Sequence, residues 1–558
     1  MWTKVLLLFF VFSFLFKSDH SFDQDLGRHI KLGEIITQSW TVPTTNLFSY
    51  TNPNFPFVNT HWLFEILAYW LSQTIGIQYL LVLKIIIFIV AVWFILKIIP
   101  KENTVLLLPV SFIFLHVLRE RTELRPEIFS FLFTALTLFI LERYKSSTLK
   151  NHKLIFLLPL IQLIWINTHI YFFVGLTLQA IFLIYLLWQY LHLKLKGDKI
   201  RFLVISLALS VLVSFLNPNG LSGLLFPLNV TKNYGYTIVE NQTMFFLERI
   251  NFRDPNFLLV KIAMGMIILS ILVAFIRRRS DVKNILLCLF GLALASINVR
   301  SFPYLVFLSL PATLVNFGPL RFGKPIISLS LVFGCLLLLE SFFYLNGDYY
   351  KYREDGHTPG LKVLESGKRA LDFVLFNNLP GPIYNNFDIG SYIIYRGFPK
   401  YQVFVDGRPE AYPAQFFTGV YIPSQSDYKN FQELNKSWNF KTIIFSHTDQ
   451  TPWGKNFLQS VLKDQDWKLV FIDDFMLVLV KPEVAEQKQL NSINLASLDP
   501  NSYPFTNHLS YLRLALFLLG TQNSESGANF IRKTLQIFPE DPIANSIIGQ
   551  KSTSNFFW

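Results

Sequence analysis

Two aspartates separated by one residue, Asp23 and Asp25, follow the first apolar segment of the chain. His29 comes shortly after them, and a stretch rich in aromatic residues then continues as far as His61. A positioned carboxylate can take a proton from an attacking hydroxyl group. An Asp-x-Asp pair can instead hold Mg²⁺ or Mn²⁺, or it can serve only as a helix cap. The two aspartates are therefore the first candidates for catalytic chemistry.

Histidines and an asparagine near turns form a second group of candidates. His29 and His61 could ligate a metal ion together with a carboxylate, or they could be satisfied polar groups at an interface. Asn167 and His169 interrupt an apolar stretch. There they could bind a ligand, or they could only satisfy the ends of broken helices.

Cations form a third group. Lys84 falls inside an apolar segment, which makes it a functional candidate, although it could also extend to the surface or pair with Glu65. Arginines in turns between apolar segments could bind the headgroups of membrane lipids or a phosphate group of a ligand. Arg125 and Arg300 are the stronger phosphate candidates of the set. The set consists of Arg119, Arg121, Arg125 and Arg300.

The segments that must position these residues are mostly apolar. The 558-residue chain is 52% hydrophobic and 15% charged, with a mean hydropathy of +0.39. Apolar runs separated by short basic loops predict a mainly α-helical membrane domain of about eleven spans. The net charge of +12 does not indicate nucleic acid as a partner, because many cations lie in these loops. The expected spans are 5–16, 77–99, 104–118, 126–142, 154–167, 170–192, 202–216, 257–276, 284–298, 302–317 and 326–345.

The basic loops also predict an orientation. If every span is counted, the basic segments near residues 97–101, 143–153 and 194–201 fall on one side, which the positive-inside rule makes cytoplasmic. The N-terminus would then be cytoplasmic. Exterior loop 17–76, with a helix along the interface from His61, and everything after residue 345 would lie outside. The carboxylates, histidines and arginines described above would therefore converge on the exterior face.

From residue 346 the composition becomes that of a soluble domain. Strands alternating with helices indicate an exterior α/β domain over 346–482, following a membrane domain over 1–345. Residues 483–505 are expected to be a linker, and 506–558 a helical hairpin with the spacing of a tetratricopeptide unit. Strands are expected at 382–384, 402–405 and 442–445, with a hairpin over 469–480.

Short motifs occur through most of residues 20–410. They are Asp23-Gln-Asp25, His29 with Gly33, Phe48-Ser49-Tyr50-Thr51, His61-Trp62-Leu63-x-Glu65, Arg125-Pro126-Glu127, Trp165-Ile-Asn167-Thr-His169, Asn217-Pro218-Asn219-Gly220, Asn298-Val-Arg300, Asn385-Asn386-x-Asp388-x-Gly390 and Val405-Asp406-Gly407-Arg408. Together they resemble those of bacterial membrane proteins related to the GT-C superfamily of glycosyltransferases. That group includes protein O-mannosyltransferases and the enzyme that adds aminoarabinose to lipid A.

The resemblance implies an inverting glycosyltransferase of the bacterial plasma membrane, which takes a sugar from a polyprenyl-phosphate donor at the exterior face. The family's loop aspartate maps to Asp25, with Asp23 as a second candidate for the catalytic base. The acceptor would be a glycan, a lipid or a protein, with membrane lipids around the spans. No cofactor is certain, although the Asp-x-Asp pair could hold a divalent cation, Mg²⁺ or Mn²⁺. The implied substrate-binding residues are Lys84, Arg125, Arg300, His29, His61, Glu65, Asn167 and His169.

Two other classes of protein fit parts of the sequence. A transporter or flippase for lipid-linked substrates would favour paired charges deep within several spans. A non-catalytic envelope scaffold would use the α/β domain and the helical tail as its working parts. Because the charged candidates gather at one predicted surface, the sequence favours surface chemistry.

Overall fold

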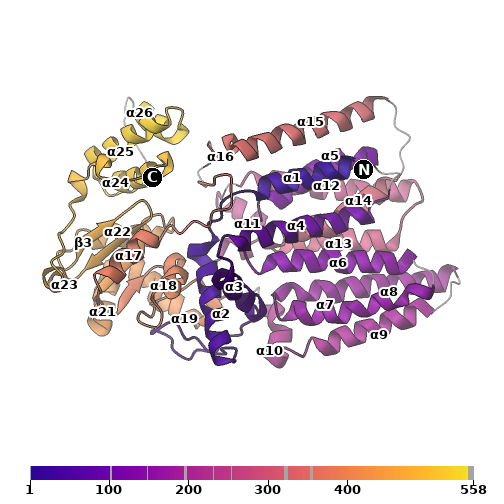
Figure 1. Cartoon of the computed structure of the whole chain (residues 1–558), viewed down its shortest axis with the longest axis horizontal. Helices are drawn as coiled ribbons and strands as arrows, with labels where there is room; N and C mark the ends of the chain where they lie inside the picture. Colours follow the sequence, from indigo (N-terminus) through magenta and orange to yellow (C-terminus); the bar gives the residue numbers. More distant parts are fainter. Residues whose placement is uncertain are drawn as a thin grey trace.

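The computed structural model describes residues 2–100, 104–146, 149–193, 198–229, 232–252, 254–318, 324–351, 353 and 356–550. Two bodies lie end to end along the long axis of the molecule (Figure 1). One is a bundle of long helices with the N-terminus at its far end. The other is a smaller α/β body with three helices beside it. Helices α2 and α3 lie where the two bodies meet (Figure 1).

Each apolar run of the bundle forms at least part of a helix. These runs are apolar on every side, as is typical of helices surrounded by lipid or by other apolar helices. The helices lie side by side (Figure 1), and most connections between them are short, except those after α1 and α9. They are α1 (Trp2–Leu15), α4 (Tyr79–Ile98), α5 (Thr104–Arg119), α6 (Glu127–Ser146), α7 (Leu157–Ile166), α8 (Phe173–Leu193), α9 (Asp198–Val213), α12 (Asn256–Ile276), α13 (Val282–Ile297), α14 (Phe302–Phe317) and α15 (Lys324–Asn346).

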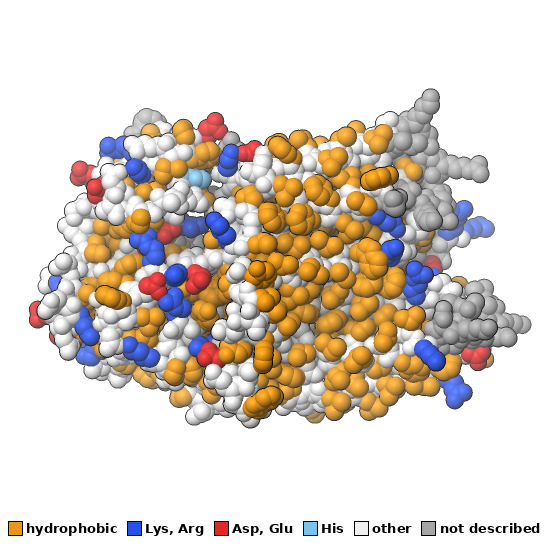
Figure 2. Space-filling view, viewed as in Figure 1, with side chains coloured by type: hydrophobic (Ala, Val, Ile, Leu, Met, Phe, Trp, Pro, Cys, Tyr) orange, Lys and Arg blue, Asp and Glu red, His pale blue; other side chains and the backbone are white. Residues whose placement is uncertain are grey.

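Four helical stretches among the described residues are long and apolar enough to cross a membrane: Tyr79–Ile98, Ile170–His192, Asn256–Ile276 and Ser328–Asn346. Others, such as α1 and α13, are apolar but only 14 and 16 residues long. The expectation of about eleven spans is therefore not confirmed, because many of the helices are shorter than the roughly 20 residues that a bilayer needs. Figure 2 shows hydrophobic side chains over most of the visible bundle surface, as expected of a membrane protein.

The segment after α1 is more regular than the sequence suggested. Residues 22–39, expected to be loop, form a π-helical turn η1 (Phe22–Leu26) and helix α2 (Gly27–Ser39). The expected interfacial helix is α3 (Trp62–Thr74). Gly33 lets α2 and α3 touch, because a Cβ atom there would lie 2.0 Å from the Glu65 carbonyl oxygen. Helix α3 is therefore held directly against the segment that carries the aspartates.

The α/β body contains a four-stranded sheet in the order β1-β2-β4-β3. β1 and β2 are parallel, and the other two pairs are antiparallel. β2 and β4 are buried along their whole length, which explains their continuous apolar sequences. The strands are β1 (Ile383–Asn385), β2 (Thr442–Ser446), β3 (Lys468–Ile472) and β4 (Met476–Val480).

One expected strand is absent. Residues 402–405 do not join the sheet, because their backbone pairs with the loop between α2 and α3 instead, through an isolated parallel bridge between Ser49 and Val403. Helices surround the sheet and form the tail, and the expected linker contains a short helix of its own. They are α17 (Lys368–Phe376), α18 (Gly390–Gly397), α19 (Ala414–Phe416), α20 (Ile422–Ser426), α21 (Tyr428–Trp438), α22 (Pro452–Val461), α23 (Pro482–Gln487), α24 (His508–Gly520), α25 (Ser524–Ile537) and α26 (Pro542–Gln550).

Candidate functional site

A cavity of about 130 Å³ lies where the bundle meets the α/β body. Turns at the end of the bundle bring most of its charged side chains together. Gly407, Pro409 and Glu410 of the α/β body complete the wall. The polar residues that line it are Asp25, Arg28, His29, Thr60, His61, Arg125, Glu127, His169, Tyr234, Asn241, Arg300 and Glu410. The cavity thus gathers several of the candidates that the sequence singled out.

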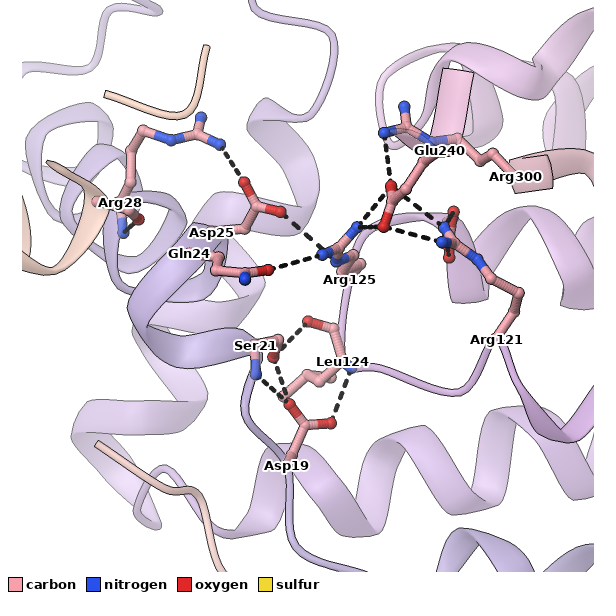
Figure 3. Close-up of polar contacts among 12 residues, drawn as sticks. Asp19, Ser21, Gln24, Asp25, Arg28, Arg121, Leu124, Arg125, Glu240 and Arg300 are labelled. Atoms are coloured by element: carbon pink, nitrogen blue, oxygen red, sulfur yellow. Dashed lines mark hydrogen bonds and ion pairs between the residues drawn. The ribbon is translucent and has the colours of Figure 1, made fainter. Parts of the chain in front are cut away.

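Asp25 lies on η1 between two arginines, as Figure 3 shows. Its Oδ1 is 3.1 Å from Nη2 of Arg28, and its Oδ2 is 3.5 Å from Nε of Arg125. Burial acts to raise the pKa of Asp25, but the charges of Arg125 and Arg28 outweigh it and hold the pKa below its usual value. A quarter of the side chain remains exposed. Asp25 is therefore an ionised carboxylate that a bound molecule can reach.

Three arginines meet around Glu240, which lies on the short helical turn η6 (Val239–Asn241) (Figure 3). Arg125 Nη1 donates to both carboxylate oxygens, at 2.7 and 2.8 Å. Arg300, on η7 (Val299–Ser301), donates from Nη2 to Oε2 at 2.9 Å. Arg121 Nη1 lies 2.8 Å from Oε1. Despite its burial, these arginines hold the pKa of Glu240 well below its usual value, so the cluster is fully charged.

His29 is held by a buried carboxylate. Its Nδ1 lies 2.9 Å from Oε1 of Glu65, whose Oε2 accepts a hydrogen bond from Nδ2 of Asn59 at 2.6 Å. Burial raises the pKa of Glu65 to about 7. Burial also lowers the pKa of His29 well below its usual value, and the charge of Arg28 adds to this effect. His29 is thus a neutral imidazole with a fixed orientation at the cavity wall.

The remaining polar candidates divide between the cavity and the bundle. His61 and His169 both line the cavity, with ring centroids 5.5 Å apart, and His169 Nδ1 lies 2.7 Å from Oγ of Ser130. Asn167 is occupied by protein groups. Its Oδ1 accepts from the indole of Trp62, and its Nδ2 donates to backbone carbonyls. This is the alternative in which Asn167 satisfies a broken helix end.

Lys84 does not reach the cavity. Its Nζ lies 2.9 Å from Oδ2 of Asp19, and the two side chains are 0% and 2% exposed. The same Asp19 oxygen accepts the backbone N–H of Leu124, and Oδ1 accepts that of Ser21. Lys84 is therefore paired with Asp19 rather than Glu65, and it fastens the turn that ends in Arg125. The side chain of Asp23 lies outside the described residues.

Arg28 and Glu240 had little or no signal in the sequence, whereas Arg408 belongs to the Val405-Asp406-Gly407-Arg408 motif but its aromatic partners were not predicted. Arg28 was visible only as a neighbour of Asp25, and Glu240 lies in a loop without a recognisable motif. Arg408 anchors the α/β side of the cavity. It donates to Asp406 from Nε at 2.7 Å and stacks its guanidinium over the rings of Phe48 and Phe57. These partners are so far apart in the chain that only the fold brings them together.

The described residues around Asp25 do not fit a divalent cation. No group of three or more His, Cys, Asp or Glu side chains among them is placed to hold a metal ion. Both oxygens of Asp25 face arginines, whose charges oppose a cation.

No protein-family model matches the chain, and no curated protein matches it. Solved structures with a similar fold include the oligosaccharyltransferase AglB of Archaeoglobus fulgidus in complex with an inhibitory peptide and a dolichol-phosphate. That match has a TM-score of 0.53 at 10% identity and covers 100% of this chain and 87% of AglB. The Archaeoglobus fulgidus oligosaccharyltransferase in complex with Zn and sulfate matches with a TM-score of 0.52 at 11% identity, over 96% and 86% of the two chains. The chain therefore shares its fold with these oligosaccharyltransferase structures.

Proposed function

We propose that the protein is a glycosyltransferase of the bacterial plasma membrane. It moves a sugar from a polyprenyl-phosphate donor to an acceptor at the exterior face of the membrane. One observation carries the proposal: an accessible carboxylate, Asp25, and a cluster of arginines meet in one cavity at the end of an apolar helical bundle. The similar fold of AglB, a structure that contains a dolichol-phosphate, supports it.

Asp25 is the catalytic base in this proposal. The hydroxyl oxygen of the acceptor forms a bond to the anomeric carbon, and its proton passes to Asp25. The bond between that carbon and the phosphate oxygen breaks, and its electron pair stays on the phosphate. Attack from the side opposite the phosphate inverts the anomeric configuration. Asp23 stays the second candidate for the base.

Arg125 and Arg300, joined by Arg121, bind the departing phosphate. Guanidinium groups suit this task because they offer paired donors to phosphate oxygens and keep their charge. His29, positioned by Glu65, contacts the transferred sugar or the acceptor hydroxyl, together with His61 and His169. Asn167 and Lys84 do not contact the substrate in this scheme, because their polar atoms already bind protein groups. They support the site through the segments that they hold.

The acceptor is a glycan, a lipid or a protein that enters from outside. The α/β body lies on that side and contributes Glu410 to the cavity wall. Membrane lipids surround the bundle, and the N-terminus lies on the cytoplasmic side.

The Asp25→Asn variant tests the proposal. Asparagine keeps the shape of the side chain but cannot accept the proton, so transfer should fall by roughly 100-fold or more while donor binding persists. The assay measures transfer of radiolabelled sugar from a polyprenyl-phosphate donor by purified protein in lipid, with donor binding measured in parallel.

Asp466→Asn is the matched control, because Asp466 is 75% exposed and absent from the cavity wall. It should transfer sugar as the unchanged protein does. Full transfer by the Asp23→Asn/Asp25→Asn double variant would rule out the mechanism and favour a transporter or a scaffold.

A further inference from the structure

The carboxylate of Glu240 lies where an arginine cluster of this kind would hold a phosphate group. It presents two oxygens and one negative charge to Arg121, Arg125 and Arg300. A phosphodiester also presents two unesterified oxygens and one negative charge, and guanidinium groups bind both kinds of anion through paired N–H donors. The side chain of Glu240 thus has the chemistry of the ligand that the arginines are proposed to bind.

The arginines have further donors to offer. Among the buried side-chain atoms of the described residues, Nε of Arg28, Arg121 and Arg300 has no hydrogen-bond partner. Nε of Arg125 also makes no hydrogen bond, and its contact with Asp25 is an ion pair at 3.5 Å. Buried donors in native proteins are nearly always satisfied, so several unpaired ones in one cluster indicate an additional acceptor. Glu240 alone does not use the full capacity of this site.

The segment that carries Glu240 is lightly packed. None of residues 232–243 is fully buried, and Tyr234, Ile238 and Asn241 from this segment line the cavity. Its main apolar contact is the ring of Tyr236, which packs among Phe387, Phe417, Tyr421 and Trp453 of the α/β body, and on the bundle side the Gln242 carbonyl accepts the N–H of Val299. A segment with little buried surface opens at low free-energy cost. The charge contacts of Glu240 are thus a main tie between this segment and the bundle.

We propose that Glu240 is an internal competitor for the donor's phosphate. It occupies the arginine site while no lipid phosphate is bound, and the donor enters by displacing Glu240 together with segment 232–243. This inference rests on the proposed function and adds a means of regulation to it. The arginines stay neutralised in the empty enzyme, because Glu240 pairs with all three of them, whereas Glu127 pairs with Arg121 and Asp25 with Arg125. Displacement also opens the cavity wall formed by Tyr234 and Ile238.

Binding of a labelled polyprenyl monophosphate to protein in lipid nanodiscs tests the inference. Glu240→Gln keeps the shape of the side chain and removes the competing charge, so it should bind the lipid phosphate at least about fivefold more tightly. The matched control is Glu248→Gln. Glu248 lies in the same exterior loop but pairs with Lys261 at the surface, so affinity should stay within about twofold. Equal or weaker binding by Glu240→Gln would overturn the inference and leave Glu240 as a support for the arginines.

Hydrogen exchange on the unchanged protein gives a second test that does not depend on a variant folding. Addition of the lipid phosphate should speed amide exchange in residues 232–243, because the segment leaves the arginines. Unchanged or slower exchange there would contradict displacement.

The same binding assay separates this inference from the proposed function. If Arg125→Gln loses binding but Glu240→Gln gains none, only the competitor role fails. If neither the unchanged protein nor any variant binds the polyprenyl monophosphate, both the competitor role and the proposed phosphate site are wrong. Excess phosphatidylglycerol in the disc should leave binding unchanged; displacement by this lipid would assign the cluster to phospholipid headgroups and overturn both.

Discussion

At the residue scale, the carboxyl groups of the site differ in their protonation states. Asp25 is held as a carboxylate by Arg125 and Arg28, in opposition to the effect of burial. Glu65 instead contacts His29 and Asn59, and burial outweighs the more distant arginine charges and raises its pKa to about 7. The two acids are suited to different tasks for this reason. Asp25 lines the cavity as an anion, whereas Glu65 orients His29 through a buried hydrogen bond.

The pKa of Glu65 predicts a dependence of stability on pH. Between about pH 4.5 and 7 the folded protein holds a proton on Glu65 that the unfolded chain has released. The stability that this proton contributes is present below about pH 4.5 and is lost as the pH rises through about 7. Glu65→Gln is neutral at every pH. The melting temperature of the unchanged protein minus that of this variant should therefore fall over this interval.

Thermal melting of both purified proteins in detergent, at steps across the same pH range, measures this difference. A difference that stays constant with pH would show that Glu65 does not titrate there.

At the scale of elements, the ion pair of Lys84 and Asp19 joins three parts of the bundle. Lys84 lies within α4, Asp19 lies in the connection between α1 and η1, and Leu124 donates its N–H from the turn before α6. Ser21 completes the set through Oδ1 of Asp19. Arg125 follows Leu124 directly, and Asp25 lies four residues after Ser21, so the buried pair constrains the separation of the proposed base from the proposed phosphate site.

Lys84→Met should destabilise the protein by about 3–5 kcal/mol, because it leaves the Asp19 carboxylate buried without its partner. Donor affinity of the folded fraction should change little. The Asp19→Asn/Lys84→Met double variant should recover part of the stability. The measurements are thermal melting and donor binding.

Lys31→Met serves as the control, because Lys31 pairs with Glu34 in a more exposed position and should cost no more than about 1 kcal/mol. If Lys84→Met has normal stability but has lost donor affinity, then Lys84 binds the donor phosphate, as the sequence suggested.

At the scale of the whole molecule, the two bodies share packing. One hydrophobic core cluster contains bundle residues such as Leu81 together with Ile393 and Val478 of the α/β body. The loop 40–61 adds a second connection through the bridge of Ser49 to Val403. The α/β body is thus a fixed wall of the cavity, and Arg408, two residues before Glu410, is anchored within it by donating from Nη2 to Asp406.

Basic residues lie at the end of the bundle far from the α/β body (Figure 2), which supports the predicted orientation. In a background without Cys288 and Cys335, single cysteines at Arg278 and Gln465, both exposed, should react with an impermeant maleimide from opposite sides of the membrane. Labelling experiments on intact cells and on inverted vesicles measure this. Reaction of both positions from the same side would contradict the orientation and the exterior site.

The sequence by itself determined the apolar helices, the approximate positions of all four sheet strands, and the group formed by Asp25, His29 and Arg125. Their signals are local: apolar runs, a change of composition near residue 346, and motifs a few residues long. The number of spans did not follow, because helix lengths depend on kinks such as the turn at Asn167 and on packing between neighbours.

Only the tertiary structure decided which charges meet. It joined Glu240 to Arg125, from which four bundle helices separate it in the chain, and to Arg300, from which two separate it. It also paired Lys84 with Asp19 instead of Glu65. The physical reason is that a buried charge needs a partner within a few ångströms. That partner is selected by the arrangement of helices and turns in space, which residue spacing along the chain does not specify.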